Sequence, residues 1–221
     1  MRNIIITVSL FLTVSIMDAQ PKLSGSLGIG YTSPDYKTFA EDPFPKLGTF
    51  ERMMIHVSFA YQFYPNARIG FSQWTAFTSD KYSGQDFKRS FNYRAISLET
   101  FFHIRRRIEL NFTLAPMINS GKISMTSSQS AAAWDSLMAE FDNSGIEISS
   151  TDEMTKTFFG FTSSIGFRFY FKPYLAFEGK IGFLETFYKN DKWKFQGKAI
   201  KGPDIDIDDM PLFTFGLVYG W

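Results

Sequence analysis

Hydrophobic and polar residues alternate along most of the chain from residue 22 to its end. A period of two residues is typical of a β-strand with one apolar face and one polar face. The third strand is less regular because Trp74 falls on its polar face, which we interpret as a bulge. The pattern predicts eight strands, at about residues 22–31, 50–63, 67–78, 92–104, 107–118, 156–171, 174–187 and from 213 to the C-terminus.

The predicted strands are joined alternately by short and long connections. Short turns at 65–66, 105–107 and 172–173 alternate with long polar segments at 32–49, 79–91, 119–155 and 188–211. Short periplasmic turns and long outer loops are typical of transmembrane barrels. The sequence therefore predicts an all-β, eight-stranded antiparallel up-and-down transmembrane β-barrel with both termini in the periplasm. A soluble β-sandwich is the alternative, but its aromatic faces would need a second layer to pack against.

Composition agrees with a barrel wall. Aromatic residues make up 18% of the 221 residues, yet the mean hydropathy is only −0.11 and 20% of residues are charged. This combination suits a wall that is apolar outside and polar inside. The absence of cysteine excludes disulfides and thiolate metal sites, and a net charge of +1 gives no electrostatic argument for nucleic acid. We expect no cofactor.

The first nineteen residues have the composition of a secretory signal peptide. Arg2 precedes an apolar run over residues 4–16, and the small residue Ala19 stands at the expected cleavage site. This run is too short for a transmembrane helix, which takes about 20 residues. A buried first strand or a short anchor is the alternative. We predict a signal peptide over 1–19 and the barrel domain over 20–221.

Charged side chains occur on the polar faces of the strands and balance in sign. An eight-stranded barrel is just wide enough for side chains to fill its interior, and buried charges must be paired there. We therefore predict a network that plugs the lumen, with a narrow pore as the alternative. Its members are Arg68, Glu99, Glu109, Arg168, Glu178 and Lys180.

The short turns predict which of these residues face each other. Pairing that is symmetric about Pro173 places Arg168 opposite Glu178. Symmetry about Arg106 places His103 opposite Glu109, so His103 joins the predicted network. Symmetry about Pro65 places Gln62 opposite Arg68.

One pair of residues raises the question of enzymatic activity. His56 and Ser58 are two residues apart and share one strand face. Small barrels that modify lipid A use a histidine, a serine and an acid, so an acyl hydrolase or transferase is an alternative function. The sequence supplies no third member and no oxyanion donor. We expect these two residues to be ordinary lumen groups and the protein to be non-enzymatic.

The third and fourth long connections carry features of their own. In the third, an apolar face at helical spacing predicts a short amphipathic helix. This helix would cover the barrel mouth, dip into the outer leaflet or bind a partner, and we favour coverage of the mouth. In the fourth, acidic residues alternate with isoleucines and are weak candidates for a Ca²⁺ site, because the ligand order of a calcium loop is missing. The helix face comprises Trp134, Leu137, Met138 and Phe141, and the acidic positions are Asp204, Asp206 and Asp208.

The C-terminal strand resembles the assembly signal of outer-membrane barrels. Its pattern has a polar residue, a glycine and two final aromatics, namely Thr214, Gly216, Tyr219 and Trp221. The whole chain resembles the small outer-membrane barrel superfamily, which includes the outer-membrane protein A transmembrane domain and opacity-type porin-family proteins. Its cleavage site and phenylalanine-rich strands resemble those of members from Bacteroidota.

This resemblance implies a place in the Gram-negative cell envelope. It implies recognition by the barrel-assembly machinery and surroundings of outer-membrane lipid and lipopolysaccharide. The outer loops would then bind a protein partner or form part of an envelope or secretion complex. The fold alone does not select among these roles.

Overall fold

The structure is a computed structural model that describes residues 22–32, 35–36, 52–82, 85–125, 130–140, 153–207 and 209–220. The predicted signal peptide lies outside these residues. The long strands are β1 (Leu23–Tyr31), β3 (Met53–Tyr64), β4 (Ala67–Tyr82), β5 (Gln85–Arg105), β6 (Ile108–Met125), β7 (Glu153–Lys172), β8 (Leu175–Thr186) and β12 (Met210–Gly220). The short elements are β2 (Asp35–Tyr36), α2 (Ser130–Glu140), β9 (Trp193–Phe195), β10 (Lys198–Ile200) and β11 (Ile205–Asp206).

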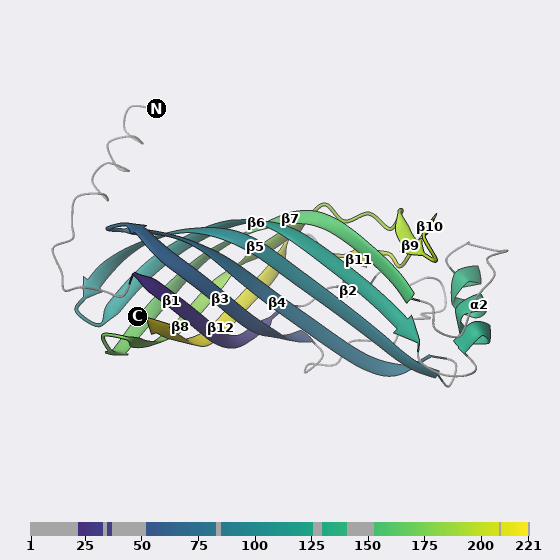
Figure 1. Ribbon diagram of the computed structural model, residues 1–221, viewed down its shortest axis with the longest axis horizontal. Helices are drawn as coiled ribbons and strands as arrows, with labels where there is room; N and C mark the ends of the chain where they lie inside the picture. The colour runs from purple at the N-terminus through teal and green to yellow at the C-terminus, as the bar shows by residue number, and fades with distance from the viewer. Residues whose placement is uncertain are drawn as a thin grey trace, which may run out of the picture.

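The eight long strands form a closed antiparallel ring. Each pairs with the next long strand along the chain, and β1 pairs with β12 to close the sheet, with Leu27 opposite Leu217. The predicted eight-stranded up-and-down barrel is therefore confirmed as the fold. Figure 1 shows the tilted strands, with the short turns and the end of β12 at one end of the barrel and α2 at the other.

The two faces of the wall follow the alternation in the sequence. Large apolar side chains point outward, with Leu27 65% and Phe159 64% exposed. The bulge predicted at Trp74 is wrong, because β4 pairs with β5 without a register shift from Ala67 to Tyr82. Trp74 instead points into the barrel and is 7% exposed. An apolar layer fills the lumen at this level, so an aromatic residue belongs on the inner face there.

Strands β4 to β7 continue beyond the apolar part of the wall. They have 16, 21, 18 and 20 residues, whereas a transmembrane strand needs about 9–11. In this extension the outward positions are polar, as at Lys88 and Thr155, and the inward positions are apolar, as at Phe87 and Ile123. Helix α2 packs on the apolar side. No helix in the described part of the chain is long and apolar enough to cross a membrane.

A close approach of two strands requires glycine where the ring closes. Gly28 on β1 lies opposite Gly216 on β12. A Cβ atom on Gly28 would lie 2.0 Å from the carbonyl oxygen of Phe215, and this backbone atom is fixed by the sheet. The seam between the first and last strands therefore depends on the missing side chain.

Candidate functional site

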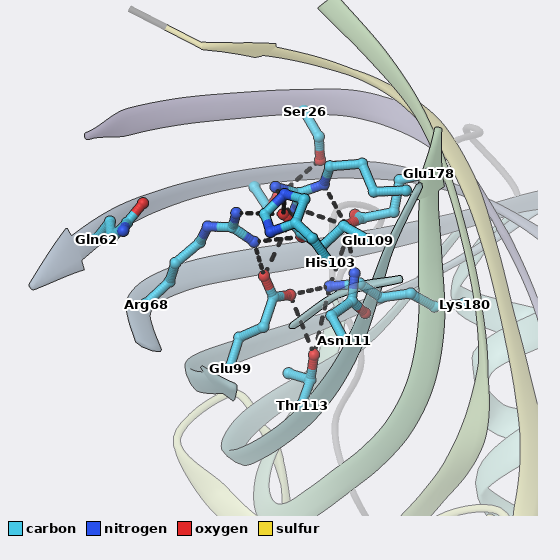
Figure 2. Close-up of polar contacts among 12 residues, drawn as sticks. Ser26, Gln62, Arg68, Glu99, His103, Glu109, Asn111, Thr113, Glu178 and Lys180 are labelled. Atoms are coloured by element: carbon cyan, nitrogen blue, oxygen red, sulfur yellow. Dashed lines mark hydrogen bonds and ion pairs between the residues drawn. The ribbon is translucent and has the colours of Figure 1, made fainter. Parts of the chain in front are cut away.

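The predicted charged residues form one network inside the barrel, which we call the lumen charge network. It comprises three basic and three acidic side chains, and Figure 2 shows the labelled members converging from different strands. The side chains are almost inaccessible to solvent, with Glu109 at 0% and Lys180 the most accessible at 16%. The members are Arg68, Glu99, Glu109, Arg168, Glu178 and Lys180.

Arg68 on β4 joins strands β5 and β6. Its Nη1 donates to Glu99 Oε1 and Glu109 Oε1, both at 2.7 Å, and its Nη2 donates to Glu109 Oε2 at 2.7 Å. The guanidinium carbon also lies 3.6 Å from the centre of the Phe101 ring. Arg68 therefore makes charged hydrogen bonds on its edge and a cation–π contact on its face.

Arg168 and Lys180 complete the network from β7 and β8. Arg168 donates to Glu178 Oε1 from Nε at 3.0 Å and from Nη2 at 2.6 Å, and lies 3.6 Å from Glu99 and Glu109. Lys180 Nζ donates to Glu99 Oε2 at 2.6 Å and lies 3.6 Å from Glu178. Every charge in the network thus has at least two opposite charges within reach, which offsets the cost of burying it.

The three pairings predicted from the turns are confirmed. The register places Arg168 opposite Glu178, His103 opposite Glu109, and Gln62 opposite Arg68. They differ in what the side chains do. Arg168 and Glu178 form an ion pair, whereas His103 Nε2 lies 3.6 Å from Glu109. Gln62 instead donates to the carbonyl of Pro65.

Three neutral residues that the sequence argument missed belong to the same site. Tyr170 donates from its hydroxyl to Glu109 at 2.9 Å. Asn111 donates to Glu178 and Thr113 donates to Glu99, both at 3.3 Å. Asn111 and Thr113 are the next inward positions after Glu109 on β6, and Tyr170 is the next after Arg168 on β7. Their two-residue spacing was the signal that could have identified them.

The residues considered for catalysis point into the lumen but do not form a catalytic pair. The hydroxyl of Ser58 makes its hydrogen bond with Ser26 at 2.6 Å. The ring of His56 stacks on Trp74 with centroids 4.9 Å apart, and Trp74 donates to Thr214 at 3.2 Å. Nucleophilic catalysis needs a base within hydrogen-bond reach of the nucleophile, and Ser58 has another hydroxyl there instead.

Two small cavities lie beside the lumen charge network. Each has a volume of about 20 Å³, and Ser72, Ser97 and Lys180 line both. A space of this size holds about one water molecule. His56 and Trp74 both line the second cavity.

Beyond the cavities most of the buried side chains are apolar, and Asn119, Arg89 and Lys156 are buried polar groups among them. One cluster, which we call the middle cluster, brings Trp74, Phe91 and Tyr93 against Phe158, Leu184 and Leu212. A second, which we call the outer cluster, lies at the mouth formed by the extended strands. There Phe87 and Ile123 of the wall pack with residues of α2 and the β9–β10 hairpin.

Helix α2 presents its predicted apolar face to the outer cluster. Trp134, Leu137 and Met138 are buried there, and the Trp134 ring lies 5.0 Å from the Phe195 ring of β9. Coverage of the barrel mouth, which we favoured among the three placements considered from the sequence, stays a prediction. Phe141, the fourth residue of the predicted face, lies outside the described residues.

The remaining predicted sites are described only in part. Thr214 and Gly216 lie on β12, and Tyr219 is 53% exposed on its outward face, while Trp221 lies outside the described residues. Their role in assembly stays a prediction. Asp204 is half-buried, whereas Asp208 and the side chain of Asp206 also lie outside the described residues. Within the described residues, no three histidine or acidic side chains are grouped to hold a metal ion.

Comparison with known proteins identifies the fold. No protein-family profile matches the chain, and no curated protein matches its sequence. Among solved structures, the outer membrane protein OprG of Pseudomonas aeruginosa is 12% identical, with 94% of this chain and 99% of that chain covered and a TM-score of 0.56.

Two further structures have the same architecture. Ail, the attachment invasion locus protein of Yersinia pestis, is 11% identical, with 92% of this chain and 100% of that chain covered and a TM-score of 0.52. Neisserial surface protein A is 10% identical, with the same coverages and a TM-score of 0.51. At these identities the similarity shows the fold alone, which is that of eight-stranded outer-membrane β-barrels.

Proposed function

We propose that the protein is a non-enzymatic integral β-barrel of the Gram-negative outer membrane whose lumen is closed to solutes. Both termini lie in the periplasm, and an outer assembly of α2 and the β9–β10 hairpin serves partner binding or an envelope complex. The observation that supports this proposal most is the presence of three successive groups of buried side chains inside the barrel. These are the lumen charge network, the middle cluster and the outer cluster.

The outward face of the wall supports insertion in a membrane. Ile96, Phe159 and Leu217 are each more than half exposed, and they represent a face that is apolar on all eight long strands. Apolar exposure on this scale in water would lead to association. In a lipid bilayer the closed ring also leaves no unpaired strand edge. The barrel-assembly machinery would recognise the C-terminal strand, and lipopolysaccharide would surround the outer half.

The filled lumen argues against a pore. An ion that entered among the paired charges would reach the middle cluster, where most of the buried side chains are apolar. Transfer of an ion from water into such surroundings costs far more than thermal energy. The cavities beside the network hold about one water each, at about 20 Å³.

No contact in the described residues favours lipid-A chemistry. Ser58 is bonded to Ser26, and His56 is stacked on Trp74 inside the wall, away from the lipid-facing surface. We expect cells that express the protein to contain unchanged lipid A, and His56→Ala to make no difference. Mass spectrometry of extracted lipid A checks this expectation.

The orientation can be tested with single cysteines because the natural chain has none. Ala139 is exposed on α2, and Arg106 is exposed in the turn between β5 and β6. In intact cells a membrane-impermeant maleimide should label Ala139→Cys and not Arg106→Cys. Permeabilising the outer membrane should make the two labelling yields equal. Labelling of Arg106→Cys alone in intact cells would refute the proposed orientation.

A further inference from the structure

The loop between β8 and β12 carries a concentration of lysines. We call residues 189–201 the lysine hairpin, because this stretch contains β9, β10 and five lysines but one acidic residue, Asp191. The carboxylate of Asp191 lies 3.7 Å from Lys156 of the wall, and Lys156 also donates to the backbone carbonyl of Asp191. The single negative charge of the hairpin is therefore already paired.

The lysine hairpin is held rigidly on the barrel. Trp193 and Phe195 are completely buried in the outer cluster, and Phe195 pairs with Met154 of β7. Trp193 Nε1 donates to the hydroxyl of Tyr188 at 3.0 Å, and that hydroxyl donates to the carbonyl of Pro203 at 2.5 Å. Because the aromatic residues fix the backbone, ligand binding costs little backbone conformational entropy in the hairpin.

The lysines themselves point to solvent. Four of them are exposed and form no ion pair with an acidic side chain in the described part of the chain. Burial alternates along β9, so that Lys194 faces outward between Trp193 and Phe195. The acidic positions of the same loop come later, from Asp204 on, where β11 pairs with β2. The four lysines are Lys189, Lys192, Lys194 and Lys198.

The hairpin adjoins the apolar wall. Lys194 lies opposite Thr155 on β7, and Phe159, two outward positions further along β7, is 64% exposed. Phe187, 66% exposed, directly precedes the loop. Thr155 also lies opposite Lys122 of β6, whose charge is paired with Glu153, so the positive charge of this surface comes from the hairpin lysines. A cationic surface thus continues directly from a surface that faces lipid chains.

We propose that the lysine hairpin binds the phosphate groups of a phosphorylated glycolipid, lipopolysaccharide, in the leaflet beside β7 and β8. This inference rests on the proposed function, because it requires the barrel to be inserted in the outer membrane. Lysine binds phosphate as a flexible point charge, and basic clusters beside a membrane are attracted to anionic headgroups. A lipid ligand is favoured over a soluble polyanion because its acyl chains would lie on the adjoining apolar wall.

The test compares the purified wild type with two variants of equal charge change in a non-ionic detergent. All three proteins are titrated with bis-phosphorylated lipid A and with the same lipid after dephosphorylation, and bound lipid is counted by native mass spectrometry. The hairpin variant combines Lys189→Gln, Lys192→Gln, Lys194→Gln and Lys198→Gln. The control changes four exposed cations at the short-turn end, with Lys22→Gln, Arg105→Gln, Arg106→Gln and Arg107→Gln.

The affinity of the wild type and of the control for the bis-phosphorylated lipid should be at least about tenfold higher than that of the hairpin variant. Each lysine beside a membrane strengthens attachment about fivefold, before screening by salt reduces the effect. Dephosphorylation should remove the difference. Equal binding by all three proteins would overturn the inference. So would heparin binding that depends on the four lysines while lipid A binding does not, because the ligand would then be a sulfated glycan.

The folded state is monitored separately by heat-modifiable migration on SDS gels. A folded barrel without lysine-dependent lipid binding overturns this inference and leaves the proposed function intact. A wild-type protein that migrates identically boiled and unboiled contradicts the proposed function itself.

Discussion

Arg68 links three strands of the barrel, and replacing it with methionine tests the lumen charge network. Methionine keeps most of the packing volume against Phe101 but removes three hydrogen bonds of 2.7 Å to Glu99 and Glu109. Glu109 then loses its nearest cation, and Glu99 keeps Lys180 at 2.6 Å. Removing one partner of a buried ion pair typically costs about 3–5 kcal/mol. Because Arg168 lies 3.6 Å from both carboxylates, we expect the lower end, about 3 kcal/mol.

A double-mutant cycle separates pairing from packing. Glu109→Gln alone leaves Arg68 with Glu99, and the combination Arg68→Met with Glu109→Gln restores a balanced lumen. The double variant should be less destabilised than the sum of the single variants by about 1–3 kcal/mol. The free energies come from reversible urea unfolding in lipid vesicles.

A surface ion pair provides the control for this cycle. Lys122 and Glu153 form an ion pair in which both side chains are about half exposed, at 48% and 47%. Lys122→Met should therefore change the free energy of unfolding by less than about 1 kcal/mol. If Arg68→Met is as mild as Lys122→Met, or if the cycle shows no coupling, the lumen charges do not stabilise the barrel as argued.

Three further predictions concern other parts of the molecule. Trp193→Ala removes a fully buried side chain, and should make the loop after β8 cleavable by trypsin in cells while the barrel keeps its heat-modifiable migration. Gly28→Ala should lower the refolding yield because the new methyl meets backbone at 2.0 Å, whereas Gly179→Ala meets aromatic side chains at 3.1 Å or more and should fold. Tyr219→Ala should reduce the amount of folded protein in outer membranes and leave the refolding yield in detergent unchanged. An equal decrease in both quantities would indicate a structural role for Tyr219 instead of a role in assembly.

Local regularities of the sequence predicted the wall of the barrel. Alternation identified the eight strands, and symmetry about the middle residue of each short turn predicted the register of the two strands that it joins. The opposition of Arg168 and Glu178 follows from the turn at Pro173 alone. These predictions succeeded because neighbours in an up-and-down barrel are also neighbours along the chain.

Contacts across the lumen could not be obtained in this way. Arg68 faces Gln62 and Glu99 on its neighbouring strands, yet it also binds Glu109, two strands away. Such a contact depends on how the ring closes and how far each side chain reaches, and neither is encoded in strand alternation. The same holds for Lys180 of β8 and Glu99 of β5.

Apolar residues on the polar faces of strands indicate apolar packing inside the barrel, and the sequence-based predictions did not include it. Trp74 was assigned to a bulge because the lumen was expected to be polar throughout. The alternation of Trp193, Lys194 and Phe195 in a long loop was passed over, although it marks a short strand with one buried face. Both patterns follow from the apolar clusters inside the barrel, which contain Trp74, Trp193 and Phe195. The signal peptide and an origin in Bacteroidota stay predictions from the sequence.

Conductance of the purified protein in a planar lipid bilayer tests the central claim most directly. A lumen filled by paired charges and two apolar clusters should give no steady current above the baseline of the bare membrane. The salt concentration is about 1 M, which is roughly ten times the ionic strength at which the Debye length is about 10 Å. Discrete, stable channels that appear only with heat-modifiable, folded protein would contradict the closed lumen and with it the proposed function.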